Sequence, residues 1–317
     1  MNTLRILFMG TPDFAVGILD HLVKSNPNIV GVVTAPDKPA GRGKKLHSSA
    51  VKVYAEKHSI EVLQPTNLKS EEFQADLKRL DPNLIIVVAF RMLPKIVWDY
   101  PEFGTFNLHA SLLPKYRGAA PINWAIINGE KETGVTTFFI DEEIDTGKII
   151  DSKRIPIEAN DDVESLHDKL MVLGAELVNE TVKSIQNGEI EAVSQTHEKS
   201  FKPAPKLTKA NTKIDWKQSA QDIVNFVRGL TPFPTAWTEL EMNGEILKIK
   251  IFKVEAKLYH HSNKIGSSYY DKEKKCICVA VEDGLILIKE LQFPGKKRMP
   301  AQALVNGMGW EYEYNFV

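Results

Sequence analysis

The sequence predicts an α/β protein in which an open, mostly parallel sheet of doubly wound type precedes a small β-barrel. Strand-like and helix-like segments alternate over the first two-thirds of the chain, which is typical of a sheet covered by helices. A segment rich in proline and lysine, residues 199–206, then interrupts this alternation. After it, short strand-like pieces separated by turns favour a barrel of the oligonucleotide-binding sort or another small β fold.

The alternating part opens with an apolar run over residues 4–9 that ends at Gly10. We expect Thr11 to cap a helix in which Pro12 takes the first position and Asp13 lies in the first turn. The run at 84–89 is apolar without alternation, as in a parallel strand buried on both faces. Further strands are expected at residues 29–33, 105–109 and 135–140, and helices at residues 51–57, 121–127 and 166–185.

The second part contains one short helix, expected at residues 220–230, and several strands. The strands are expected at residues 236–241, 246–254, 276–281 and 285–291. Turn signals such as Asn243-Gly244 and Asp283-Gly284 separate them. We therefore expect an α/β domain over residues 1–200, a linker over 201–209 and a barrel domain over 210–317.

Composition excludes several classes of protein. Of the 317 residues, 43% are hydrophobic and 26% are charged, which is typical of a globular chain and not of a disordered one. The longest apolar run, residues 84–90, is too short to span a bilayer, and the first residues lack the layout of a secretory signal. The only cysteines, Cys276 and Cys278, form neither a zinc motif nor a favourable disulfide pair. We expect a reduced, cytoplasmic protein without a structural metal.

Two nucleotide-binding motifs are missing. A dinucleotide enzyme would have a G-x-G-x-x-G fingerprint after the first strand, but Gly10 is followed by Pro12 and Ala15 at the positions of the other glycines. The chain also lacks the G-x-x-x-x-G-K-[ST] loop of nucleotide hydrolases. Nicotinamide, flavin and phosphate-loop chemistry are therefore disfavoured.

Asn107 and His109 are the first candidates for a site. They lie two residues apart on the strand expected at 105–109, so they share one face, and they lie near its carboxyl end, where open α/β sheets bind ligands. An irregular Ser-Leu-Leu-Pro segment follows directly. The alternative is a histidine and an amide that only satisfy each other or nearby backbone in the core.

Residues 141–145 contain four acids after the next strand. Most such runs are solvated loops, but one carboxylate could reach His109 from the same sheet edge and fix the orientation of its ring. Asn, His and Asp at one place suit acyl transfer, because Asn and protonated His stabilise an oxyanion and Asp helps remove a proton. Since no serine or cysteine stands in a recognised nucleophile motif, direct transfer is the simpler mechanism.

Charge is unevenly distributed. Residues 1–205 have 23 basic and 28 acidic side chains, whereas residues 206–317 have 17 and 13. The loop at 34–46 contains Arg42, Lys44 and Lys45, and its prolines and glycines are expected to prevent regular structure. A second basic cluster lies at 295–298. Both clusters can contact phosphates, although such a cluster taken alone is more often a solvated surface, and the uneven charge can be compositional scatter.

Taken together, the motifs of this chain resemble those of the methionyl-tRNA formyltransferase family, and the resemblance extends over nearly the whole sequence. The individual motifs are short, but their joint order and spacing are specific. They are Gly10-Thr-Pro-Asp-Phe-Ala, Pro36-Asp-Lys-Pro-Ala-Gly-Arg-Gly-Lys-Lys, Asn107-Leu-His-Ala-Ser-Leu-Leu-Pro, Arg117-Gly-Ala-Ala-Pro-Ile, Glu132-Thr-Gly-Val-Thr, Asp145-Thr-Gly, Lys206-Leu-Thr-Lys, Ile214-Asp-Trp216, Gly295-Lys-Lys and Ala301-Gln.

The resemblance implies a Rossmann-like formyltransferase domain followed by a β-barrel. It implies transfer of a formyl group from 10-formyltetrahydrofolate to the α-amino group of methionyl initiator tRNA. It assigns catalysis to Asn107, His109 and Asp145, and the folate site to Ser111, Leu112, Leu113 and Pro114. The residues expected to contact tRNA are Arg42, Lys44, Lys45, Lys206, Lys296, Lys297 and Arg298.

One segment departs from the family pattern, because Phe90-Arg91 stands where the family usually has Tyr-Gly at the border of the folate site. An inward-pointing Arg91 would disturb folate contacts there. The nearest rival activity is an N-formyltransferase acting on a nucleotide-linked amino sugar. Glycinamide ribonucleotide transformylase, formyltetrahydrofolate hydrolase and a catalytically dead tRNA-binding module are further alternatives. Since the sequence leaves no apolar stripe unused, we expect a monomer.

Overall fold

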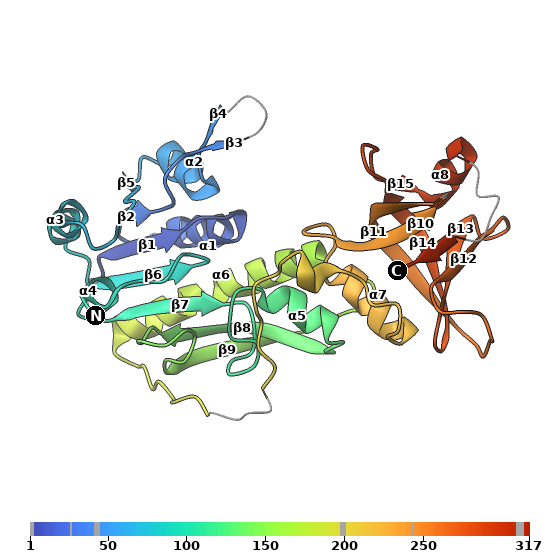
Figure 1. Ribbon diagram of the computed structural model, residues 1–317. Helices are drawn as coiled ribbons and strands as arrows, with labels where there is room; N and C mark the ends of the chain where they lie inside the picture. The colour runs from blue at the N-terminus through green and yellow to red at the C-terminus, as the bar shows by residue number, and fades with distance from the viewer. Residues whose placement is uncertain (1–2, 26, 41–44, 197–200, 243, 309–313) are drawn as a thin grey trace. The chain divides into compact units, whose positions relative to one another are not determined.

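A computed structural model describes residues 3–25, 27–40, 45–196, 201–242, 244–308 and 314–317. The chain divides into two compact units. The first, called here the sheet unit, comprises Met1–Pro121, Glu132–Pro156 and His167–Pro203. The second, the barrel unit, comprises Ile122–Lys131, Ile157–Leu166 and Ala204–Val317. The two units are coloured mainly blue to yellow-green and orange to red in Figure 1.

The sheet unit is built on one mostly parallel sheet, as the sequence predicts. Its strand order is β5-β2-β1-β6-β7-β8-β9. The strands β5 to β7 in this order pair in parallel, and β8 and β9 are antiparallel additions at one edge. The bounds are β1 Ile6–Gly10, β2 Ile29–Val33, β5 Val62–Leu63, β6 Leu84–Val88, β7 Thr105–His109, β8 Glu132–Phe139 and β9 Ile149–Pro156.

Both faces of the central strands are buried. All five residues of β1 and of β6 are inaccessible or nearly so. On one face, Leu7 and Ile85 pack with Phe73 and Leu77. The helices are α1 Asp13–Lys24, α2 Ala50–Lys57, α3 Glu71–Leu80, α4 Lys95–Trp98, α5 Pro121–Ile127 and α6 Val163–Asn187. Continuous apolar strands therefore mark the middle of the sheet, as their lack of alternation indicated.

Two local expectations are wrong. Thr11 does not cap α1, because Pro12 itself takes the N-cap position and its carbonyl accepts from Ala15 N at 2.9 Å. The basic loop also has regular structure, since β3 Lys38–Ala40 pairs with β4 Lys45–His47. Pro39 is tolerated there because a two-stranded ribbon consists only of edge strands.

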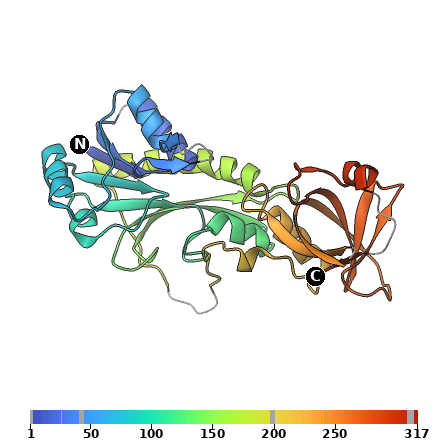
Figure 2. The ribbon, with the colours of Figure 1, turned by 45° about the horizontal axis from the view of Figure 1, so that its top comes forward.

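The barrel unit contains a closed barrel of six strands within the described residues. The strands run in the order β11-β10-β16-β12-β13-β14, and β14 pairs back to β11. Figure 2 shows these orange and red strands curving around a common interior. The bounds are β10 Ala236–Met242, β11 Glu245–Leu258, β12 Ser267–Asp271, β13 Cys276–Val281, β14 Gly284–Gln292, β15 Met299–Pro300 and β16 Tyr314–Phe316, with η1 Ala210–Thr212, α7 Ala220–Arg228 and α8 Ala301–Met308. The predicted fold class is confirmed.

The two cysteines have a packing role. Alternate residues of β13, such as Ile277 and Val279, belong to the barrel core. Cys276 and Cys278 belong to a small cluster with Leu285 on the other face. Both are free thiols, and burial raises the pKa of Cys276 to about 12, so the reactive thiolate is strongly disfavoured.

Candidate active site

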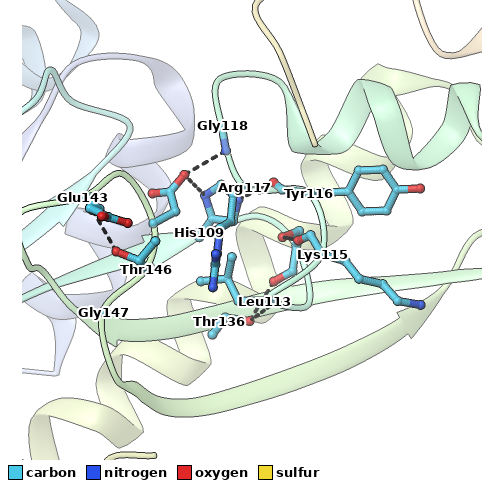
Figure 3. Close-up of polar contacts among 12 residues, drawn as sticks. His109, Leu113, Lys115, Tyr116, Arg117, Gly118, Thr136, Glu143, Thr146 and Gly147 are labelled. Atoms are coloured by element: carbon cyan, nitrogen blue, oxygen red, sulfur yellow. Dashed lines mark hydrogen bonds and ion pairs between the residues drawn. The ribbon is translucent and has the colours of Figure 1, made fainter. Parts of the chain in front are cut away.

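The carboxyl end of β7 presents the two residues that the sequence singles out. His109, the last residue of β7, is 6% exposed, and Asn107 on the same face is half-buried. His109 Nε2 lies 2.8 Å from the carbonyl oxygen of Tyr116, and because a carbonyl can only accept, this nitrogen donates (Figure 3). No other described residue hydrogen-bonds with the Asn107 side chain, so its amide is available to a ligand.

Asp145 is the acid of the 141–145 run that reaches His109. Its Oδ2 lies 3.8 Å from His109 Nδ1 and accepts a hydrogen bond from Gly118 N at 2.9 Å. The other three acids of the run are exposed, as expected of a solvated loop. The loop returns tightly to β8, because a Cβ on Gly147 would lie 1.7 Å from the carbonyl oxygen of Phe139. Only glycine fits there, and this close approach holds the loop that contains Asp145 against β8.

The His109 ring therefore lies between two acceptors, the Tyr116 carbonyl and the Asp145 carboxylate. A neutral imidazole that donates through Nε2 turns the lone pair of Nδ1 toward Asp145. An imidazolium has a proton on both nitrogens and suits both neighbours. The two neighbours thus fix the orientation of the ring at the end of β7.

The Ser111–Pro114 segment is fixed by buried hydrogen bonds. Thr136 Oγ1 on β8 donates to the carbonyl of Ser111 at 2.7 Å and accepts from Leu113 N at 3.2 Å. The fully buried Ser111 Oγ donates to the carbonyl of Lys115 at 2.7 Å. Leu112 and Pro114 are only half-buried. The segment is therefore an irregular loop with a defined shape beside His109.

Gln195 is a site residue that the sequence analysis missed. Its side chain is 8% exposed, and its Nε2 donates to the carbonyls of Asp145 at 3.0 Å and Gly147 at 2.8 Å. Its Oε1 accepts from Arg117 Nε at 3.1 Å and from Arg117 Nη2 at 2.6 Å. One buried amide thus joins the Asp145 loop to the loop that follows His109. A single glutamine that lies 48 to 78 residues from its partners is part of no motif that could have revealed these contacts.

The departure at Phe90-Arg91 does not direct a charge into the core. Arg91 is exposed, and its guanidinium donates to the carbonyls of Thr66 at 2.9 Å and Pro65 at 2.5 Å. It also lies 5.6 Å from the centroid of the Phe90 ring. The arginine is therefore held by backbone acceptors of residues 65–66.

The predicted tRNA-binding residues are all peripheral where they can be described. Arg42 and Lys44 lie outside the described residues, and Lys45 is described only as part of β4. Lys206, Lys296 and Lys297 are exposed on the barrel unit. Arg298 is paired, since its Nε donates to Glu290 Oε2 at 2.7 Å and its guanidinium lies 4.6 Å from the Phe252 ring centroid.

The residues that the structure describes lack two further kinds of feature. Among these residues, no three or more His, Cys, Asp or Glu side chains are grouped so that they could hold a metal ion. None of their helices combines the length and the apolar character that a membrane span requires.

Comparisons with known proteins agree along the chain. The Formyl transferase model matches residues 4–182, and the Formyl transferase, C-terminal domain model matches residues 206–309. A methionyl-tRNA formyltransferase of Flavobacterium johnsoniae is 54% identical over 313 residues, which cover 99% of each chain. One of Bacteroides thetaiotaomicron is 51% identical over 308 residues, 96% of this chain and 95% of that one.

Solved structures share the fold at lower identity. HypX from Aquifex aeolicus in complex with tetrahydrofolic acid matches with a TM-score of 0.63 and 18% identity, over 96% of this chain and 47% of that one. An N-formyltransferase from Helicobacter canadensis in complex with folinic acid and dTDP-3-aminofucose matches with a TM-score of 0.65 and 22% identity. The match covers 93% of this chain and 100% of that one. Both parts of the sequence match formyl transferase models, and close relatives match nearly its full length: the chain belongs to the methionyl-tRNA formyltransferase family.

Proposed function

We propose that this protein transfers the formyl group of 10-formyltetrahydrofolate to the α-amino group of methionine on initiator tRNA. The observation that carries the proposal is the pairing of His109 with Asp145 beside Asn107 at the end of β7, in a chain 54% identical to a named methionyl-tRNA formyltransferase. The related activity on a nucleotide-linked amino sugar has only distant structural neighbours in its support.

In the proposed reaction the neutral α-amine attacks the formyl carbon directly. An α-amine has a pKa of about 8, so a usable fraction is neutral near pH 7. The Asn107 amide and His109 donate to the oxyanion of the tetrahedral intermediate, and for this His109 Nε2 exchanges its bond to the Tyr116 carbonyl for one to the oxyanion. Asp145 holds the ring of His109 and accepts the proton that the attacking amine loses.

The reaction balances without a further reagent. A bond forms between the amine nitrogen and the formyl carbon, and the bond from that carbon to N10 of the folate breaks. The amine gives up one proton and the departing tetrahydrofolate nitrogen takes up one. The Asp145 carboxylate and the His109 ring, 3.8 Å apart, provide one group that can accept a proton and one that can pass a proton on.

For the folate we propose a site along Ser111–Pro114 and the Phe90-Arg91 segment. The support is the defined shape of the first segment, which two bonds to Thr136 hold beside His109. Because Arg91 is directed to the carbonyls of residues 65–66, we assign folate contacts at this segment to backbone and to Phe90.

For tRNA we propose contacts through Arg42, Lys44, Lys45, Lys206, Lys296 and Lys297, in a protein that acts as a monomer. Phosphate contacts need charge and reach, which exposed lysines provide. Arg298 already pairs with Glu290, so we assign it a smaller share.

The proposal is tested by formyl transfer from labelled 10-formyltetrahydrofolate to three acceptors offered separately. These are methionyl initiator tRNA, methionyl elongator tRNA and a nucleotide-linked amino sugar. We expect transfer to the initiator tRNA, inhibited by folate analogues. Transfer to the sugar alone would contradict the tRNA proposal while keeping the catalytic assignment.

A further inference from the structure

The barrel unit contains a pocket that the proposed reaction does not use. It is a cavity of about 360 Å³, within the size range of small-ligand sites. Its lining includes Leu207, Lys209, Pro234, Trp237, Lys248 and Lys250. A planar aromatic ring, apolar side chains and three lysines thus meet in one concave surface.

Trp237 is held in place as a platform. Its Nε1 donates to the carbonyl of Lys209 at 2.9 Å, and the residue is half-buried. The ammonium groups of Lys209, Lys213 and Lys248 lie 5.8, 5.7 and 5.2 Å from the ring centroid. The indole therefore lies in a strongly positive environment.

That positive charge is only partly neutralised. Glu239 accepts from Lys213 at 2.8 Å and lies 3.9 Å from Lys248, and the Lys213 hydrogen bond is the main cause of its lowered pKa. Neither Lys209 nor Lys250 forms an ion pair among the described residues, and both are exposed, although the charge of Lys209 also contributes to the lowered pKa of Glu239. Two lysines at the pocket are thus available for an anion.

A second aromatic ring lies next to the pocket along the chain. Phe233 is 80% exposed and stands between Pro232 and Pro234, of which Pro234 lines the cavity. Exposed aromatic rings beside unpaired lysines are the recurring elements of surfaces that bind single-stranded nucleic acid, because bases stack on the rings and phosphates pair with the lysines.

We infer that the Trp237 pocket binds one unpaired nucleotide of an RNA chain, with the base against Trp237 and a flanking phosphate at Lys209 and Lys250. The apolar wall explains why a base and not a bare phosphate fits. This inference rests on the proposed function in one respect, since that function makes a tRNA the natural source of the nucleotide.

The test is a titration of a fluorescein-labelled single-stranded RNA hexamer with the full-length protein, read by anisotropy. We expect the Trp237→Leu variant to bind about 5- to 150-fold more weakly, the range for loss of one stacked base, while Trp237→Phe keeps most of the affinity. The double variant Lys209→Ala/Lys250→Ala should lower the slope of log affinity against log salt by about 0.7, the value for the one phosphate that the two lysines share. Replacing the Lys209 side chain leaves its carbonyl bond to Trp237 intact.

The matched control is Lys272→Ala/Lys274→Ala, which removes two exposed lysines from the turn between β12 and β13. This control variant should bind the RNA hexamer as tightly as wild type. If both double variants weaken binding equally, or if Trp237→Leu binds like wild type, the inference is wrong. Thermal unfolding checks each variant, and the lysine pair decides the test if Trp237→Leu does not fold.

Competition identifies the occupant. AMP should displace the hexamer at concentrations at which inorganic phosphate and a reduced folate do not, and equal displacement by either would overturn the inference. If Trp237→Leu lost AMP but bound RNA normally, the pocket would be a free-nucleotide site instead. Formyl transfer by wild type is measured in parallel, so that failure of the proposed function is seen separately from failure of this pocket.

Discussion

The candidate active site and the Trp237 pocket are built in opposite ways. In the sheet unit, His109 and Gln195 are 6% and 8% exposed, and hydrogen bonds to backbone atoms fix both. In the barrel unit, Lys209 and Lys250 are exposed and unpaired among the described residues. Chemistry requires fixed donors at defined distances, whereas binding of phosphates tolerates movement of long side chains. The two regions should therefore respond differently to substitution.

The largest effect is expected at His109. Because removal of one oxyanion donor costs on the order of a hundredfold or more in rate, His109→Ala should reduce turnover by at least that factor. Affinity for tRNA should change little, since the residue is buried in the sheet unit. Single-turnover formyl transfer and a tRNA binding assay measure the two quantities.

The matched control for His109 is His167→Ala, which removes a half-exposed histidine on α6 that pairs with Asp168. It should leave turnover unchanged. Turnover of His109→Ala within a few-fold of wild type would remove this histidine from the mechanism.

Gln195 should give the next largest effect. Gln195→Met keeps the approximate volume but removes four hydrogen bonds, so we expect kcat to fall about tenfold to hundredfold as Asp145 and Arg117 lose their positions. Gln195→Glu keeps the acceptor for Arg117 but places a carboxylate against two carbonyls. It should therefore be at least as impaired.

Two measurements distinguish a positioning role of Gln195 from a role in stability alone. They are the temperature dependence of kcat and the comparison of kcat with KM. Two buried carbonyls left without partners cost about 1–3 kcal/mol each, so thermal unfolding will shift. A positioning role predicts that kcat stays low well below the unfolding temperature, with KM nearly constant. Recovery of kcat on cooling would show that Gln195 only stabilises the fold.

The exposed lysines should give a smaller, salt-dependent effect. Affinity for tRNA should fall linearly on a log–log plot against salt, and Lys296→Ala/Lys297→Ala should lower the slope by about one per lysine that contacts a phosphate. Filter binding at several salt concentrations measures the slope, and kcat should be unaffected. A flat salt response of wild type would contradict phosphate contacts altogether.

The smallest effect is expected at the base of the basic loop. Asp37 accepts from Lys52 at 2.6 Å and from Gln64 at 2.9 Å, and the Lys52 hydrogen bond is the main cause of its lowered pKa. A lowered folded-state pKa adds stability above the unfolded-state pKa of about 3.9, and this contribution is lost as pH falls through the folded-state value. The gap in Tm between wild type and Asp37→Asn should thus be constant near neutral pH and close below about pH 4.

Calorimetry from neutral to acidic pH measures that gap. Glu56→Gln is the control, because Glu56 lies 3.9 Å from the same lysine and is largely exposed. It should produce a smaller gap. A gap for Asp37→Asn that is equal at every pH would show that the carboxylate charge is not what stabilises the loop.

The sequence predicted those parts of the site that strand periodicity determines. Asn107 and His109 share a face because side chains alternate along β7. The expectation that the acidic run leaves its strand at the same sheet edge is wrong, because β8 is antiparallel to β7 and Phe139 lies opposite Phe106. Asp145 reaches His109 because its loop folds back along the strands. Continuous apolar runs likewise predicted the buried strands β1 and β6.

Contacts between distant loops have no such periodicity. Gln195 meets Asp145 and Arg117 only after the chain has folded, and no local pattern marks a glutamine for that position. The Trp237 pocket is likewise lined by residues that are far apart in the sequence, from the segment around η1, from β10 and from β11. Composition showed that the second part of the chain is basic. It could not show that Arg298 pairs with Glu290, whereas Lys209 forms no ion pair with any residue that the structure describes.

The central claim is that His109 and Asp145 act as one unit, and a double-mutant cycle tests it most directly. Single-turnover rates would be measured for His109→Ala, Asp145→Asn and the double variant; asparagine suits the positive φ of 58° at this position. If Asp145 works through His109, the double variant should be about as slow as His109→Ala alone. Rate losses that multiply would show that the two residues act independently and would contradict the account.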